Sequence, residues 1–164
     1  MKYPKTTKKS GDRAEPGVQY AALPWRVNDA GAVEILLLTS RETRRWVIPK
    51  GWPMKGRKPA ATAALEALQE AGLLGKIEKK AIGSFIYRKR LKNGAALLCL
   101  VEVFPLRVLR QRKNWPEKGQ RMTQWFAYEA AAGQVAEPEL QELIRRFGAA
   151  PKKRPLDSAK GSAG

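Results

Sequence analysis

With 164 residues, the chain suits one domain of ordinary size and has no room for two sizeable cores. It carries 32 Lys and Arg residues against 15 Asp and Glu and no His, so its formal net charge of +17 favours polyanionic partners. Its single cysteine, Cys99, excludes an internal disulfide, and no apolar run approaches a membrane span of roughly 20 residues, so we expect a soluble cytoplasmic protein without a membrane partner.

Both ends of the chain have the composition of disordered basic tails. Residues 1–13 and 149–164 lack apolar periodicity and are rich in Lys, Pro, Gly and Ser. The predicted domain is therefore residues 14–148. This domain still holds 23 basic and 13 acidic residues, so its basic character does not depend on the tails.

The first half of the domain shows strand signals followed by one helix. Strands are predicted at residues 18–27, 32–40 and 45–51. An Asn-Asp-Ala-Gly turn at 28–31 joins the first two, and the third runs into a loop rich in Gly and Pro. Pro59 suits the first turn of a helix that continues to residue 71, and Gly72 suits its left-handed end.

The second half returns to strands and closes with a helix. Two long strands at 76–94 and 95–108 are predicted around an Asn-Gly turn at 93 and 94, with a further strand at 120–128. In the segment 137–147, apolar residues recur at helical spacing, which predicts a helix with one face in the core: Leu140, Leu143, Ile144 and Phe147.

Three oxygen-bearing side chains share one face of the helix predicted before Gly72. Glu66, Gln69 and Glu70 are spaced at i, i+3 and i+4. Carboxylates crowded on one face repel each other unless a cation lies above them, and hard oxygen ligands suit Mg²⁺ or Mn²⁺. The spacing therefore indicates a metal-binding platform, with Glu66 and Glu70 as candidate catalytic residues.

The segment from Gly51 to Leu73 resembles the Nudix box. That motif has Gly, five residues, Glu, seven residues, Arg-Glu, an aliphatic residue, any residue, Glu-Glu, any residue, Gly and an aliphatic residue. The matching positions are Gly51, Glu66, Glu70, Gly72 and Leu73. The box is degenerate at three positions: Arg57 replaces the first Glu, Leu65 replaces the Arg and Gln69 replaces the first Glu of the closing pair. We expect fewer or weaker metal ions than a full box holds.

Two further runs carry the resemblance beyond the box. Residues 35–52 resemble the strand, turn and strand that precede the box in the diphosphoinositol polyphosphate phosphohydrolases, and residues 114–147 resemble the closing strand and helix of that group. The likeness covers roughly residues 17–148. It implies an α/β (α+β) fold, the Nudix-type α/β/α sandwich with a mixed β-sheet.

The resemblance implies a metal-dependent pyrophosphohydrolase with Mg²⁺ or Mn²⁺ as cofactor. A small, highly anionic polyphosphate is then the substrate, such as a diphosphoinositol polyphosphate or a dinucleoside polyphosphate. Two alternatives remain open at this point. One is a non-catalytic Nudix-like module that binds RNA or another polyanion through its basic surface and tails, and the other is a pyrophosphohydrolase acting on RNA 5′ ends.

Cations near the box are candidates for substrate binding, because Arg and Lys are the usual phosphate ligands. By resemblance, Thr39, Ser40 and Arg41 stand in the phosphate-contacting turn of the subgroup, and Arg121 matches a basic residue before a Trp-Phe pair. Further candidates lie in loops of the box or near predicted strand ends: Lys50, Gly51, Lys55, Arg57, Lys58, Arg88, Lys89 and Arg90.

Two questions stay open from the residues alone. The general base could be a box glutamate, another acid brought near by the fold, or a hydroxide on the metal; neither Glu102 nor Glu117 is distinguished by its surroundings. Among the tryptophans, Trp46 and Trp125 are predicted core residues of strands, whereas Trp52, in the loop after Gly51, is the candidate for stacking on a base.

Overall fold

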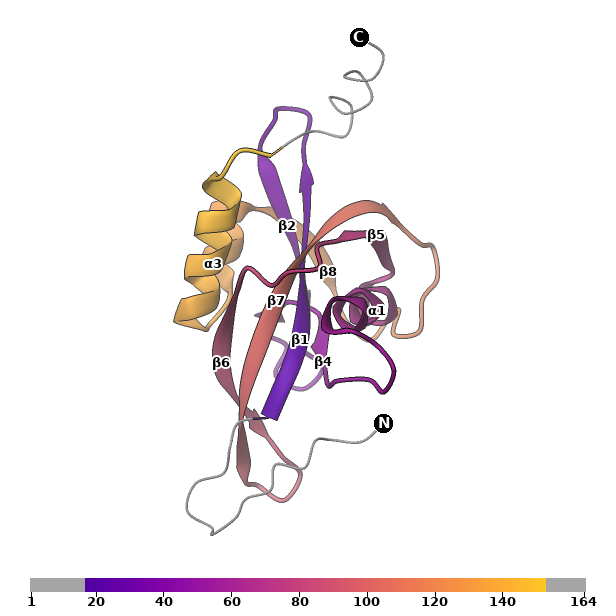
Figure 1. Ribbon diagram of the computed structural model, residues 1–164, viewed down its shortest axis with the longest axis vertical. Helices are drawn as coiled ribbons and strands as arrows, with labels where there is room; N and C mark the ends of the chain where they lie inside the picture. The colour runs from indigo at the N-terminus through magenta and orange to yellow at the C-terminus, as the bar shows by residue number, and fades with distance from the viewer. Residues whose placement is uncertain (1–16, 153–164) are drawn as a thin grey trace.

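A computed structural model describes residues 17–152 (Figure 1). Eight strands form one mixed sheet: β1 (Gly17–Val27), β2 (Val33–Thr39), β3 (Trp46–Val47), β4 (Lys50–Gly51), β5 (Leu73–Ile77), β6 (Gly83–Arg90), β7 (Ala96–Gln111) and β8 (Thr123–Ala127). The helices of this part of the chain are α1 (Pro59–Ala71), α2 (Tyr128–Gln134) and α3 (Pro138–Ala149). The mixed α/β class expected from the sequence is confirmed.

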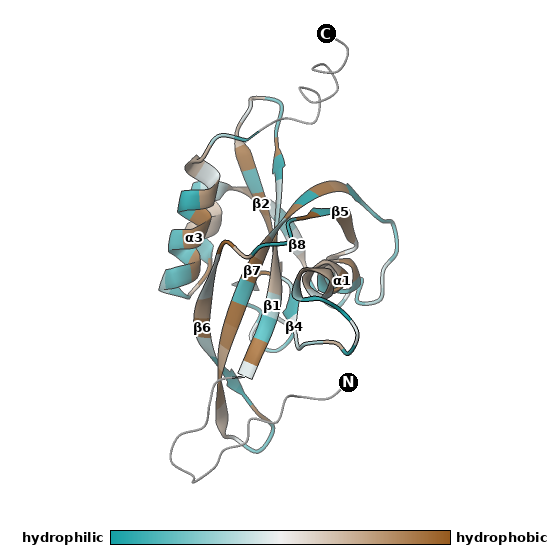
Figure 2. Ribbon diagram, viewed as in Figure 1, coloured by the Kyte–Doolittle hydropathy of each residue, from teal (hydrophilic) through white to brown (hydrophobic). Residues whose placement is uncertain are grey.

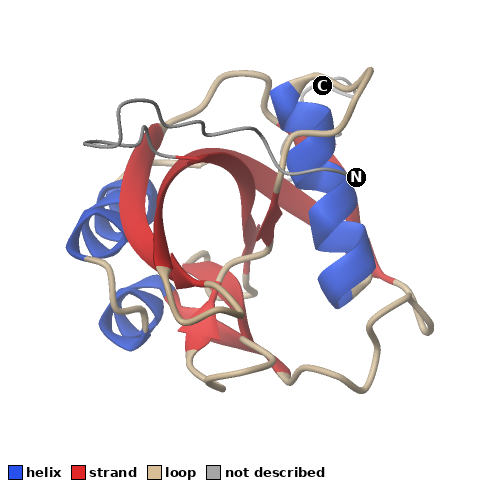
Figure 3. Ribbon diagram, turned by 90° about the horizontal axis from the view of Figure 1, so that it is seen from below, coloured by secondary structure: helices blue, strands red, loops and turns tan. Residues whose placement is uncertain are grey.

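Two long strands organise the sheet. β1 and β7 lie side by side in parallel, with Gly17 opposite Cys99 and Trp25 opposite Arg107. β2 and β4 pair antiparallel with β1, whereas β5 and β6 pair antiparallel with β7. β3 and β8 extend the sheet beyond β2. Each long strand thus changes partner along its length, and the sheet curves, as Figure 3 shows.

The helices cover the two faces of this sheet. Alternate residues of β1 point to opposite faces, so Ala21 and Leu23 join one apolar core, whereas Ala22 joins the other. The first core packs against α2 and α3, and the second packs against α1. Two helices lie on one side of the curved sheet and a single helix on the other (Figure 3), and hydrophobic segments run along the central strands between them (Figure 2).

Three elements differ from the sequence prediction. The run 76–94 is not one strand: β5 ends at Ile77, residues 78–82 form a break, and β6 begins at Gly83. The predicted strand at 45–51 is divided into β3 and β4. Helix α2 was not predicted, because its sequence, Tyr-Glu-Ala-Ala-Ala-Gly-Gln, is too short to show a helical stripe.

The ends of the chain remain a prediction. The tail at 1–13 lies outside the described residues, as does the tail at 149–164 apart from its first four residues. Within residues 17–152, no helix has both the length and the apolar character needed to cross a membrane.

Candidate active site

Helix α1 holds the candidate metal ligands, and its sequence explains where it begins and ends. Pro59 stands at its start, and Gly72 closes it in the left-handed conformation with φ of 72°, where its N–H bonds the carbonyls of Ala67 and Leu68. A row of small residues packs onto the sheet: Ala60, Ala63, Ala67 and Ala71. The face with Glu66, Gln69 and Glu70 therefore lies next to the alanine face that packs on the sheet.

Glu66 lies directly against the backbone of Gly51. A Cβ atom at Gly51 would come within 2.0 Å of Glu66 Oε2. Gly51 is fixed in turn by β4, which pairs with β1 so that Gly51 is opposite Tyr20. Glycine at this position of the box therefore allows the Glu66 carboxyl group to approach the backbone closely, since any side chain there would displace that carboxyl group.

The two carboxyl groups of α1 form a pair in which Glu70 is buried and Glu66 is partly buried. Glu70 is only 7% exposed. Burial raises the pKa of Glu70 well above its ordinary value, a shift that the nearby Arg121 opposes and the Glu66 carboxyl reinforces. The pKa of Glu66 is also raised, chiefly by burial, and the two side chains share a hydrogen bond. Two acids so placed favour either a shared proton or a bound cation.

The donor set fits one divalent cation. Within residues 17–152, no three His, Cys, Asp or Glu side chains come together as a metal-ligand group. Mg²⁺ needs less than that, because it is commonly held by one or two carboxylates and completed by water and substrate phosphates. Glu66 and Glu70 can supply the carboxylates, and the side chain of Gln69, partly exposed on the same face, can supply a neutral oxygen.

A loop before β8 docks along the C-terminal half of α1. Arg112 donates its N–H to the carbonyl of Gly72, and Glu117 donates its N–H to that of Gln69. The Glu117 carboxylate binds Arg121 at 2.8 Å, and Arg121 also donates to the carbonyl of Thr39 at 3.2 Å. The loop thus places Glu117 close enough to raise the pKa of Glu66, although burial is the larger cause of that shift.

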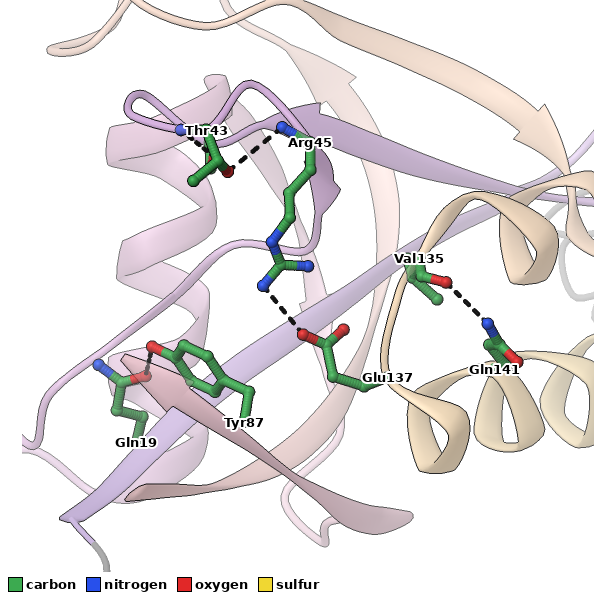
Figure 4. Close-up of polar contacts among 8 residues, drawn as sticks. Gln19, Thr43, Arg45, Tyr87, Val135, Glu137 and Gln141 are labelled. Carbon is green, nitrogen blue, oxygen red and sulfur yellow. Dashed lines mark hydrogen bonds and ion pairs between the residues drawn. The ribbon is translucent and has the colours of Figure 1, made fainter. Parts of the chain in front are cut away.

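A cluster of polar side chains lies near the carboxyl pair. The Lys50 ammonium is 4.8 Å from the centre of the Tyr87 ring, and the Tyr87 hydroxyl donates to Gln19 at 2.8 Å. Burial lowers the pKa of Lys50, and the nearby charges of Glu70 and Glu137 oppose that shift. Arg45 binds Glu137 at 3.0 Å (Figure 4).

Sequence reasoning identified Lys50 in this cluster and missed Gln19, Arg45, Tyr87 and Glu137. One signal was available: Gln19 occupies an inward position of β1, where its neighbours Ala21 and Leu23 are apolar, and it is 3% exposed. A polar residue at such a position needs a partner. Arg45 and Glu137 carried no signal of their own, because they meet across 92 residues of sequence.

The turn predicted to contact phosphate is largely occupied by its own hydrogen bonds. Thr39 is 5% exposed, and its hydroxyl accepts the N–H of Met122. The Ser40 hydroxyl pairs with that of Thr43. Arg41 is exposed and donates to Gln120 at 3.0 Å. Of these residues, Arg41 is the one whose side chain can reach a ligand without breaking the turn.

The remaining basic candidates fall in two places. Lys55, Arg57 and Lys58 are exposed in the loop before α1. On β6, Arg88 and Arg90 are exposed and alternate with Tyr87 and Lys89, so the two sets point to opposite faces of the sheet. Lys89 shares the face of Tyr87 and is near enough to lower the pKa of Lys50, although burial is the main cause of that shift.

The interpretation of Trp52 as a stacking residue is wrong. Its side chain is 9% exposed and packs in the core under Gly17, where a Cβ atom would meet the indole ring at 2.8 Å. Apolar burial therefore prevails over the loop position that suggested exposure. Trp46 and Trp125 pack against the two cores, as expected. Glu102 is partly exposed on β7, paired in register with Tyr20 and Ser84.

The sequence is similar to plant Nudix hydrolases, although no protein-family model matches it. It is 23% identical over 124 residues to Nudix hydrolase 12, mitochondrial, of Arabidopsis thaliana, a match covering 74% of this chain and 61% of that protein. It is 29% identical over 131 residues to Nudix hydrolase 17, mitochondrial, of the same plant, covering 76% and 68%. The chain thus spans about three fifths of the length of several of these relatives.

Solved structures share the fold. An Ap4A hydrolase of C. elegans in a binary complex superposes with a TM-score of 0.61 at 22% identity, covering 80% of this chain and 95% of that one. The Nudix domain of Shewanella oneidensis NrtR, complexed with ADP ribose, gives a TM-score of 0.60 at 11% identity, covering 86% and 91%. At these identities the likeness establishes the arrangement of the sheet and helices.

Proposed function

We propose, because the chain belongs to the Nudix superfamily, that it is a hydrolase of phosphoanhydride bonds that uses Mg²⁺ or Mn²⁺. The observation that carries the proposal is the pair of the buried Glu70 and the partly buried Glu66, bordered by the cations Lys50 and Arg121. A fold stabilised only by packing gains nothing from two carboxyl groups buried together, since each loses hydration. Their position suits a cation that neutralises them.

The reaction is attack of water on a phosphoryl group, with the anhydride oxygen leaving on the second phosphate. The divalent ion, when bound by Glu66 and Glu70, supplies charge neutralisation of the phosphate oxygens and acidifies water. Lys50 contributes its ammonium group beside this pair, held against the face of Tyr87. Glu117 is our candidate for positioning the attacking water, because its ion pair with Arg121 keeps it near Glu66 and Glu70.

We propose a small, highly anionic substrate, such as a diphosphoinositol polyphosphate or a dinucleoside polyphosphate. Lys50 supports this choice because its charge acts on Glu70, and the exposed Arg41 adds a second cation in the turn between β2 and β3. The Ap4A hydrolase of C. elegans, which shares the fold, acts on a dinucleoside polyphosphate. The cytoplasm remains our expectation for the compartment.

A hydrolysis panel, with the products separated by chromatography, tests the function. Diphosphoinositol polyphosphates, dinucleoside polyphosphates, nucleotide sugars and triphosphorylated RNA would each be incubated with wild type and Glu70→Gln in Mg²⁺ and in Mn²⁺. We expect turnover on the order of 1–10³ s⁻¹ on at least one small substrate, lost in the variant. Hydrolysis of triphosphorylated RNA alone would favour the alternative of a pyrophosphohydrolase acting on RNA 5′ ends. If no substrate is hydrolysed, the proposal that the protein is an enzyme is wrong.

One observation favours a second candidate, a module that binds RNA or another polyanion. Residues 79–101 contain no acidic residue and six basic ones: Lys79, Lys80, Arg88, Lys89, Arg90 and Lys92. Four of these lie in β6 or in the turn of the β6–β7 hairpin, with Arg88, Arg90 and Lys92 exposed. A cationic strand of this kind attracts a phosphate backbone and makes binding depend on salt.

Removing charges from the hairpin tests whether RNA binds there or simply responds to the net positive charge of the protein. We would replace Arg88, Arg90 and Lys92 by Gln and compare RNA binding with a control that loses the same charge elsewhere, at the exposed Lys76, Arg110 and Lys113. The second candidate requires that the hairpin variant alone lose affinity and salt dependence. Equal losses in both variants would mean that only net charge matters.

A further inference from the structure

The turn between β2 and β3 presents one arginine whose hydrogen bonding is incomplete. Nη2 of Arg45 donates to Glu137 at 3.0 Å. Nη1 of the same guanidinium is buried and has no acceptor among residues 17–152. A buried N–H without an acceptor costs stability, and a guanidinium remains charged at all ordinary pH values. The structure thus leaves one donor of a permanent cation free for another partner.

The turn holds this arginine rigidly. The carbonyl of Arg45 accepts the N–H of Ser40, and the carbonyl of Ser40 accepts the N–H of Arg44, which has a positive φ of 61°. The hydroxyls of Ser40 and Thr43 pair inside the turn. The Arg45 side chain extends from this turn toward Glu137, with Tyr87 nearby (Figure 4). Its direction is therefore fixed before any ligand arrives.

The surroundings of Arg45 suit an anion. Burial is the main cause of the lowered pKa of Lys50, and the positive charge of the nearby Arg45 lowers it further, so the two cations repel each other. Glu137 is the acid that Arg45 contacts, and it balances one charge of the two. The Arg45 side chain as a whole is 36% exposed, whereas its Nη1 atom is buried on the inner side of the guanidinium. A phosphate oxygen would complete both the hydrogen bonding and the charge.

We infer that Arg45, held in place by Glu137, is a substrate-binding residue of this site and donates from Nη1 to a phosphate oxygen of the bound polyphosphate. The inference rests on the proposed function for the identity of the ligand. It assigns separate roles to the two partners: Arg45 contacts substrate, and Glu137 is a positioning residue that sets the direction of the guanidinium.

Binding of inorganic pyrophosphate with Mg²⁺, measured by titration calorimetry, tests the assignment without requiring turnover. Loss of one charge-assisted hydrogen bond should weaken binding by about 10- to 100-fold in Arg45→Ala. Arg45→Lys should recover part of the loss, because it keeps the charge without the planar fork. Arg145→Ala is the matched control, since Arg145 also pairs with an acid, Glu129 at 3.3 Å, and should leave binding unchanged.

A second variant distinguishes substrate contact from a purely structural ion pair. Glu137→Gln removes the charge pairing but keeps a side-chain oxygen that can accept from Nη2 of Arg45, so the guanidinium should keep its direction. Pyrophosphate should then bind at least as well as to wild type, while the melting temperature falls as it does in Arg45→Ala. Equal losses of binding in both variants, or unchanged binding in Arg45→Ala, would overturn the inference. A wild type that binds pyrophosphate through Arg45 yet hydrolyses nothing in the panel would instead overturn the proposed function alone.

Discussion

The carboxyl group of Glu66 occupies the space that a side chain at Gly51 would fill: an added Cβ atom would come within 2.0 Å of Glu66 Oε2 and 2.3 Å of its carboxyl carbon. The strand end β4 and the helix α1 are therefore in contact through one acid and one glycine. Because the displaced atoms are at the end of a flexible side chain, a substitution here would move the candidate ligand more than the backbone.

We predict that Gly51→Ala loses activity while the fold persists. Movement of the Glu66 carboxyl by about 1 Å would cost on the order of 100-fold in turnover. Gly75→Ala is the contrasting variant, because a Cβ atom at Gly75 would meet the backbone carbonyl of Arg107 at 1.9 Å. That variant should lower the denaturant midpoint strongly. A Gly51→Ala protein with wild-type turnover would show that Glu66 does not act from its present position.

The pair of acids on α1 predicts a pH dependence in the absence of metal. The pKa of Glu70 is raised in the fold relative to its ordinary 4.5, mainly by burial. Above pH 4.5 the folded protein therefore binds more protons than the unfolded chain, and stability falls as the pH rises through the window up to the folded pKa. Glu70→Gln removes this contribution, so without metal it should be more stable than wild type at pH 7.

Addition of Mn²⁺ should reverse that order. Wild type should gain melting temperature as the ion neutralises Glu66 and Glu70, whereas Glu70→Gln should gain little. Melting curves in chelator and in Mn²⁺, from pH 4 to 8, make the comparison, with Glu142→Gln on the exposed side of α3 as the control. Parallel pH profiles for wild type and Glu70→Gln would mean that the Glu70 pKa is not raised.

Helix α1 and most strands were predictable from sequence because their signals are local. Pro59 and Gly72 mark the ends of α1 through backbone chemistry alone, and Asn93-Gly94 marks the β6–β7 turn, where Gly94 has a φ of 90°. The spacing of Glu66, Gln69 and Glu70 likewise follows from helical geometry. By contrast, β5 contains Gly75 and a bulge at Leu74 and Gly75, which interrupts any alternation of apolar residues.

The polar side of the site could not be predicted, because it depends on contacts between distant segments. Arg45 meets Glu137, and Tyr87 meets Gln19 across 68 residues. Periodicity predicts which face of a strand is inward and does not predict which strand will be the neighbour. Trp52 shows the same limit, since its burial depends on Gly17 at the start of β1.

Gln69→Glu should strengthen metal binding. Gln69 is partly exposed on the face shared by Glu66 and Glu70, so a carboxylate there adds negative charge where a cation is expected. We expect tighter Mn²⁺ binding by calorimetry and lower stability in chelator, because three acids then repel each other. Gln69→Leu is the control, as it removes the oxygen without adding charge. Weaker Mn²⁺ binding in Gln69→Glu would place the metal elsewhere.

The ion pair between Glu117 and Arg121 should contribute to stability, unlike the pair between Glu129 and Arg145. The Arg121 side chain is 11% exposed, and it also donates to the Thr39 carbonyl, whereas the Arg145 and Glu129 side chains are 46% and 65% exposed. Glu117→Ala leaves a nearly buried guanidinium short of a partner, which should cost roughly 1–3 kcal/mol of unfolding free energy. Glu129→Ala should cost at most about 1 kcal/mol, because water screens the exposed pair.

Urea unfolding of the two variants measures both costs, and turnover measures the separate role proposed for Glu117. If Glu117 positions water, Glu117→Gln should reduce turnover on the preferred substrate by about 10²- to 10⁴-fold, with little change in KM. That substitution keeps an oxygen to accept from Arg121, so the loop along α1 should stay docked and the loss of unfolding free energy should be smaller than in Glu117→Ala. A Glu117→Gln protein with normal turnover and normal stability would leave Glu117 as the partner of Arg121 and return the role of base to the acids of α1.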